Sequence, residues 1–95
     1  MDTATTPASA SQELEHLEAL KHHLAARGFR ARVVQPRSKS TFLHVVNVEA
    51  NQLSEDITCA QAEGELCFLW SWGMPITPVR HVESAVERVV YVLSP

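Results

Sequence analysis

Five histidines and two cysteines are the residues of this chain whose side chains could bind a metal ion or act as a nucleophile. His16 and His23 are seven residues apart, which on a helix places them two turns and about 10.5 Å apart, too far to share one ion. His22 and His23 are adjacent and would point about 100° apart. The chain has no His-x3-His, Cys-x2-Cys or His-Glu-x-x-His motif. We therefore expect neither a metal site nor a cofactor.

Cys59 and Cys67 lie in segments with the character of strands, where burial rather than an electropositive cleft is expected. A catalytic cysteine needs a base and an orienting group, and nothing in the spacing fixes His44 in that position. We interpret both cysteines as buried side chains, and as reduced thiols rather than a disulfide. The three glycines form no phosphate-binding cluster. These observations favour a protein that is not an enzyme.

The charged residues form three blocks along a chain whose net charge is −3. Residues 1–18 hold four acids and no Lys or Arg, residues 19–48 hold six Lys or Arg and no acid, and residues 49–95 hold seven acids and two arginines. This asymmetry can attract an acidic partner or let two copies of the chain complement each other. The alternative is a solvated hairpin whose basic face balances neighbouring acids in the folded molecule.

The basic block supplies most of the residues that we consider candidates for binding a partner. They are Arg30, Arg32, Arg37 and Lys39, with Phe42 and His44 on the predicted arginine face. Positive charge beside a stacking ring is a feature of nucleic-acid-binding surfaces, but such domains are usually strongly basic overall. The double-stranded-RNA-binding fold does not fit, because its basic final helix is absent: residues 79–95 carry two arginines against two glutamates.

Two amphipathic helices are predicted, one before and one after the strands that carry these residues. Leucines recur at spacings of three and four over residues 14–24, with Ser11 as the N-cap and Gly28 as the stop signal. A closing helix is predicted from the apolar spacing over residues 82–93. Residues 1–10 lack the apolar side chains that offset the entropy of ordering, so we expect a disordered tail followed by one domain over residues 11–95.

Two hairpins are predicted between the helices. In the first, pairing of Gln35 with Thr41 puts Phe29, Ala31, Val33, Leu43 and Val45 on a core face, and Arg30, Arg32, Val34, Phe42, His44 and Val46 on the other. In the second, a turn at Glu63-Gly64 joins residues 56–61 to residues 65–72. A two-residue loop pairs Cys59 with Phe68, whereas a three-residue loop with a glycine bulge pairs Cys59 with Cys67. Both registers remain open at this stage.

The order of elements is therefore α-β-β-β-β-α. We predict an α+β two-layer sandwich, with a four-stranded antiparallel sheet and both helices on one of its faces. The apolar runs are too short to span a membrane, and the N-terminal residues do not have the pattern of a signal peptide. A cytoplasmic location is expected.

The segment Trp70-Ser71-Trp72, followed by Gly73-Met74-Pro75-Ile76, is the most distinctive stretch of the chain. Trp70 is expected to fill the core, and Trp72 either to seal the corner before the last helix or to form an aromatic platform for a partner. Together with the Leu-rich helix that ends in Gly-Phe and with the closing helix, this segment resembles small actinobacterial proteins of unassigned function. The resemblance spans roughly residues 14–93 and implies no activity.

The leading hypothesis is a small regulatory or accessory protein that acts through protein–protein contacts as a homodimer. A strand that is apolar on both faces over residues 66–70 and the opposed charge blocks motivate it, and burial of the second sheet face would form the dimer. The first alternative is nucleic-acid binding through the basic region 21–39. The second is a small-molecule-binding or enzymatic pocket near Trp70, Trp72 and His44.

Overall fold

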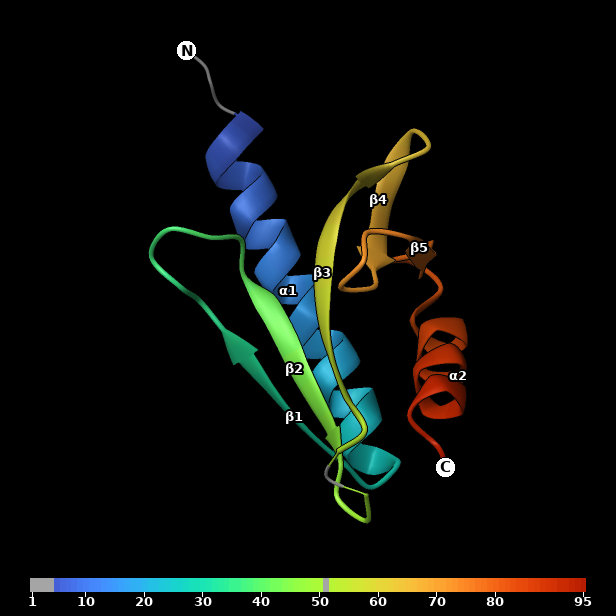
Figure 1. Cartoon of the computed structure of the whole chain (residues 1–95). Coiled ribbons are helices and arrows are strands. Elements are labelled where there is room, and N and C mark those ends of the chain that lie inside the picture. Colours follow the sequence, from blue (N-terminus) through green and yellow to red (C-terminus); the bar gives the residue numbers. More distant parts are fainter. Residues whose placement is uncertain (1–4, 51) are drawn as a thin grey trace.

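The computed structural model describes residues 5–50 and 52–95, and the side chains from residue 12 onward within those ranges. In the chain, one helix precedes the five strands and a second helix follows them (Figure 1). In chain order the elements are α1 (Thr5–Ala26), β1 (Phe29–Val34), β2 (Phe42–Asn47), β3 (Ser54–Ala62), β4 (Glu65–Leu69), β5 (Pro75–Pro78) and α2 (Val82–Val92). The strands form one antiparallel sheet in the order β1-β2-β3-β4-β5. The predicted α+β two-layer class is confirmed.

Helix α1 begins at Thr5, six residues before the predicted cap at Ser11, so it includes part of the segment that we expected to be a tail. Residues 1–4 lie outside the described residues. Pro7 is compatible with the first turn of a helix, where its missing N–H would have no intrahelical partner. Further along, Leu17, Leu20 and Leu24 are fully buried, as the leucine spacing predicts. The helix ends at Ala26, and Gly28, two residues later, has a φ of +91°.

The register of the first hairpin agrees with the prediction. Phe29 pairs with Asn47 and Val34 with Phe42, which continues to the expected pairing of residues 35 and 41. Leu43 and Val45 are fully buried on the face that carries the helices. Arg30, Arg32 and His44 therefore lie on the opposite face, which no described helix covers and which we call the open face.

The second hairpin has the two-residue turn, so the sequence alternative with a glycine bulge is not the one adopted. Glu63 and Gly64 have φ values of 54° and 86°, which are the conformations of a hairpin turn that matches the twist of its strands. Cys59 accordingly pairs with Phe68, and Ala60 pairs with Cys67. The two cysteines are free thiols on opposite faces of the sheet.

Strand β5 is the element that the sequence did not predict. We expected residues 73–78 only to break the preceding strand, but Pro75–Pro78 returns antiparallel to β4 and adds a fifth strand. The N–H of Trp70 donates to the carbonyl of Met74 at 2.9 Å, and the N–H of Gly73 donates to the carbonyl of Trp70 at 2.9 Å. These bonds close a tight loop over residues 70–74, which reverses the chain and brings the prolines to the edge of the sheet.

Both helices pack on one face of the sheet around a single core. Helix α1 lies against β1, β2 and β3, and α2 lies beside α1 and against β5 (Figure 1). The fully buried core residues with the largest side chains are Phe68, Leu17, Leu20, Leu24, Leu43, Ile57, Val45 and Val89. Just after the end of α2, the carbonyl of Leu93 accepts a hydrogen bond from the side-chain amide of Asn47 at 2.7 Å. This bond ties the end of β2 to the end of α2.

The Cys59 thiol gives a pH-dependent prediction. Burial, followed by the nearby Glu13 carboxylate, raises the pKa of Cys59 from 9.0 to about 12. Below about pH 9 the thiol is protonated in both the folded and the unfolded chain. Between pH 9 and about 12 only the unfolded chain loses this proton, so the free energy of unfolding should fall as the pH rises.

Urea unfolding measured at several pH values above 8 checks this expectation. Cys59→Val keeps an apolar side chain at this position and removes the titrating group, so its stability should fall less steeply with pH than that of the unmodified chain. Parallel pH profiles for the two proteins would contradict the assignment of the effect to Cys59.

Candidate interaction surfaces

The open face is the first surface that could bind a partner, because the strand register gathers most of the predicted site residues there. Arg30 pairs with Val46, Arg32 with His44, and Val34 with Phe42, so these six side chains share this face. The arginines are exposed, whereas Phe42 and Val34 are partly buried. The open face is thus apolar along its centre and basic at its β1 side.

His44 and Asp56 are cross-strand neighbours on the open face. Nδ1 of His44 lies 2.6 Å from Oδ1 of Asp56, and both side chains remain more than a third exposed. Next to them is a shallow hollow of about 370 Å³ lined by Lys39, Ser40, Phe42, Asp56, Thr58 and Ser71. The imidazole is held by a carboxylate, but among the described side chains no cysteine or serine nucleophile is hydrogen-bonded to it. The arrangement orients His44 and is too open to exclude water from a reaction.

The six cations of the basic block divide into two groups. Lys21 lies 3.5 Å from Glu18, and Arg27 lies 2.7 Å from Glu87, so these two cations balance the acids of the helix layer. Among the residues whose side chains the structure describes, the other four have no carboxylate within 4.0 Å. They are Arg30, Arg32, Arg37 and Lys39. The two paired cations precede the hairpin, and the four cations of β1 and its loop are the ones without a carboxylate at this distance.

A second surface lies on the side of the helices, around the 70–74 loop. The rings of Trp70 and Trp72 stack with their centroids 5.2 Å apart and their planes 8° from parallel. Trp70 packs against the core, whereas Trp72 is 59% exposed. The carboxylate of Glu55 accepts a hydrogen bond from the backbone N–H of Ser71 at 2.6 Å and so holds the loop to β3. The two indole rings thus stand on a fixed loop.

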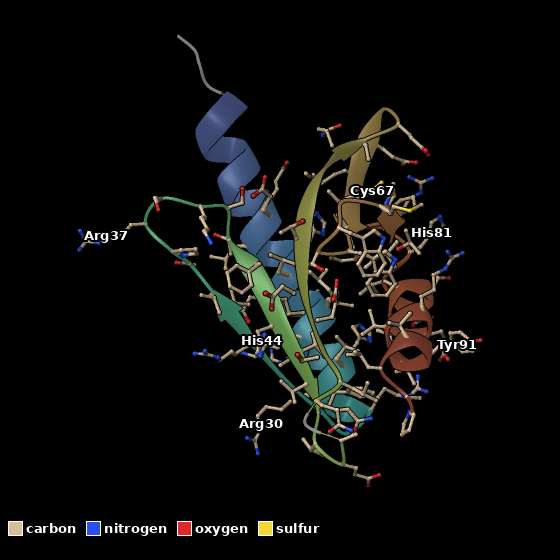
Figure 2. All side chains as sticks on the ribbon, in the orientation of Figure 1. Arg30, Arg37, His44, Cys67, His81 and Tyr91 are labelled. Atoms are coloured by element: carbon tan, nitrogen blue, oxygen red, sulfur yellow. The ribbon has the colours of Figure 1, made fainter. Side chains whose placement is uncertain are left out.

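Helix α2 continues this second surface. Its outward side carries Tyr91, which is 83% exposed, and Val92. These two residues, with Trp70, Glu87 and Arg88, line a hollow of about 330 Å³ between the loop and the helix. We call the loop residues Trp70, Trp72 and Met74 together with Tyr91 and Val92 the aromatic surface. Figure 2 shows Tyr91 projecting outward from α2, on the opposite side of the molecule from Arg30 and Arg37.

The structure separates the residues predicted to form a site into two groups. Arg30, Arg32, Phe42 and His44 share the open face, and Lys39 lines its hollow. Trp72 belongs instead to the aromatic surface, and the hollow beside Trp70 does not include His44. The small-molecule pocket considered as the second alternative function therefore stays a prediction.

Sequence reasoning did not identify Met74, Tyr91 and Val92 as surface residues. A signal for the last two was present, because both fall between the buried positions of α2 at Val89 and Leu93. A helix with one buried side presents such residues to solvent, and neither side chain belongs to the core cluster. Met74 carries no such signal, since its exposure depends on the unpredicted return of the chain into β5.

Cys67 lies on β4, on the opposite face of the sheet from Cys59, and is buried beside the β3–β4 turn. Its thiol donates to the carbonyls of Glu65 at 3.6 Å and Ala62 at 3.7 Å. Burial raises the pKa of Cys67, and the neighbouring Glu65 carboxylate raises it further. A protonated thiol is a poor nucleophile, so this cysteine is not poised for reaction.

Within the described part of the chain, no three His, Cys, Asp or Glu side chains converge in a way that could hold a metal ion. Neither α1 nor α2 contains an apolar stretch long enough to span a membrane. Comparison of the chain with protein-family models, with curated proteins and with solved structures gives no match. The properties of the open face and the aromatic surface are therefore the basis for assigning a function.

Proposed function

We propose that this protein is a non-catalytic binding protein that acts through protein–protein contacts as a homodimer, and that the aromatic surface forms the dimer interface. The observation that carries the proposal is the distribution of exposed apolar side chains. Large apolar side chains are strongly exposed at Val48, Trp72, Met74, Tyr91 and Val92. Four of these five belong to the aromatic surface and none to the open face. Trp72 stacks on Trp70, which shares a hollow with Tyr91 and Val92, and groups of exposed apolar side chains of this kind mark interaction sites.

The residue types fit an interface better than a solvated surface. Tryptophan, tyrosine and arginine are the residues that most often dominate binding energy at protein interfaces. The aromatic surface has two tryptophans and a tyrosine, with Arg88 at the edge of its hollow. Trp72 is held by its stack on Trp70, so little conformational entropy is lost when a partner covers it.

The charges of α2 make this surface complementary to a second copy of itself. Arg88 has no carboxylate within 4.0 Å among the described side chains. Glu83 lies in the first turn of the helix, and Glu87, the residue before Arg88, is paired with Arg27. A two-fold axis near the middle of α2 would pack two copies of the helix against each other in antiparallel orientation. The Arg88 of each copy would then approach the acidic first half of the other α2, and Tyr91 would approach the partner's hollow.

This placement differs from burial of the second sheet face, which we expected from the sequence. The β1 side of the open face carries cations without carboxylate partners, and stacking two such faces would desolvate them. An interface on α2 leaves the open face accessible in both copies.

Tryptophan fluorescence tests the interface directly, since both tryptophans of the chain belong to the aromatic surface. On dilution from high to low micromolar concentration, the emission of Trp72 should shift to longer wavelength and become more accessible to acrylamide as the dimer separates. In the Trp72→Phe variant, which retains Trp70, the change on dilution should be much smaller. Emission and quenching that are independent of concentration in the unmodified chain would count against the proposal.

A further inference from the structure

The free edge of β1 is a second feature that points to a ligand. Strand β1 is the first of the five strands and pairs only with β2, so its other side faces outward (Figure 1). Within the described residues, no backbone hydrogen bond from a turn or loop reaches residues 29–34. Every second residue of an edge strand leaves its N–H and C=O groups unpaired. This row of free backbone groups can form hydrogen bonds with another strand.

The two edges of the sheet differ in a way that makes β1 the accessible one. Strand β5 has four residues and begins and ends with proline, which has no N–H to donate. Strand β1 has six residues, no proline and no register shift against β2. A six-residue strand offers about 20 Å of edge, enough to pair with an extended segment of similar length.

The side chains of β1 define the chemistry of the segment that would pair with it. Arg30 and Arg32 lie on the open face, exposed and without a carboxylate within 4.0 Å among the described side chains. On the other face Phe29, Ala31 and Val33 are partly buried against the core. An added strand would place alternate side chains beside the arginines and the intervening ones beside the apolar row.

We infer that the β1 edge binds an extended protein segment in which acidic and apolar residues alternate. The acids would pair across the ladder with Arg30 and Arg32, and the apolar residues would extend the core beyond Ala31. A second copy of β1 does not fit, because antiparallel pairing of two copies would bring four arginines together on one face. The same charges that discourage self-association therefore select an acidic partner. The inference rests on the proposed role as a protein-binding module.

A titration with labelled synthetic peptides tests this inference. The probe is a peptide of about ten residues in which Glu alternates with Val, and its binding is followed by fluorescence anisotropy at about 0.15 M salt. A peptide of the same composition with its glutamates in one block, and an alternating peptide with N-methyl groups along one edge, are the matched ligands. The inference predicts that the alternating peptide binds at least about tenfold more tightly than either.

Two double variants distinguish the contribution of β1 to peptide binding from that of the loop after it. Arg30→Ser with Arg32→Ser should weaken binding of the alternating peptide about tenfold, whereas Arg37→Ser with Lys39→Ser should change it less than about threefold. All four residues are exposed, so neither variant should alter the fold, which circular dichroism checks. Hydrogen exchange should slow at residues 29–34 when the alternating peptide is bound.

Several results would overturn the inference. Equal binding of the alternating, blocked and N-methylated peptides would reduce the effect to general attraction of negative charge. Binding of a single-stranded oligonucleotide by the basic residues, without binding of the peptide, would assign this surface to nucleic acid. No binding of any ligand would also overturn it. Val92→Glu should bind the peptide as the unmodified chain does, so failure of the dimer and failure of the β1 site are distinguished.

Discussion

Replacing Phe68 by alanine is expected to destabilise the fold by about 3–5 kcal/mol, the usual cost of removing a fully buried phenylalanine. Phe68 is 0% exposed, pairs with Cys59 on β3 and Thr77 on β5, and belongs to the core between the sheet and the helices. A chain of 95 residues has a total stability of about 5–14 kcal/mol. The variant should therefore lose a large fraction of it.

Urea unfolding at one fixed protein concentration measures this loss, because dimerisation would make the apparent stability depend on concentration. Phe42→Ala is the matched control, since it removes the same ring from the partly buried open face. We expect this control to cost about half as much or less. Equal losses in the two variants would contradict the placement of the core on one face of the sheet.

Replacing Val92 by glutamate is expected to separate the dimer. Burying a carboxylate in an apolar interface without a partner costs about 2–4 kcal/mol, which corresponds to a dimer Kd raised about 30- to 700-fold. Val92 is 43% exposed on α2 and outside the monomer core, so the fold itself should tolerate the change.

Val48→Glu provides a closely matched control. Val48 is 46% exposed, so the two valines have nearly the same accessibility, but Val48 lies in the turn after β2 and outside the aromatic surface. Light scattering coupled to size-exclusion chromatography should show a smaller species for Val92→Glu and the mass of the unmodified chain for Val48→Glu. Loss of the dimer in Val48→Glu alone would place the interface elsewhere.

The local registers could be predicted from the sequence because short-range rules determine them. Alternation around the Pro36–Ser40 loop gave the pairing of β1 with β2, and with it the face on which Arg30 and His44 lie. The leucine spacing gave the buried side of α1. For the Glu63-Gly64 turn the sequence left two registers open, and the positive φ values of both residues correspond to the two-residue form.

The rest of the candidate site depends on how distant elements meet, which local patterns do not specify. The sequence of Pro75–Pro78 predicts the end of the preceding strand, because proline is rare inside sheets. An edge strand, however, can accommodate proline. The return of the chain through β5 sets Trp70 beside α2, and Trp72 stacks on Trp70. Tyr91 and Val92 follow ordinary helical spacing, and only the packing of α2 shows that they lie next to Trp70.

The two surfaces give the proposed binding protein two separate roles. The aromatic surface would join two copies, and the basic β1 edge of each copy would remain free for an acidic segment of a partner. The resemblance to actinobacterial proteins stays a prediction, and it contributes nothing to this division of roles. The two surfaces lie on opposite sides of the molecule, so one can be altered without the other (Figure 2).

Sedimentation equilibrium of the unmodified chain tests the homodimer most directly. Over about 1–100 μM, a range suited to interfaces of modest affinity, the average mass should rise with concentration from that of the 10.6 kDa monomer toward twice that value. A mass that stays at 10.6 kDa across this range would contradict the dimer and the role proposed for the aromatic surface.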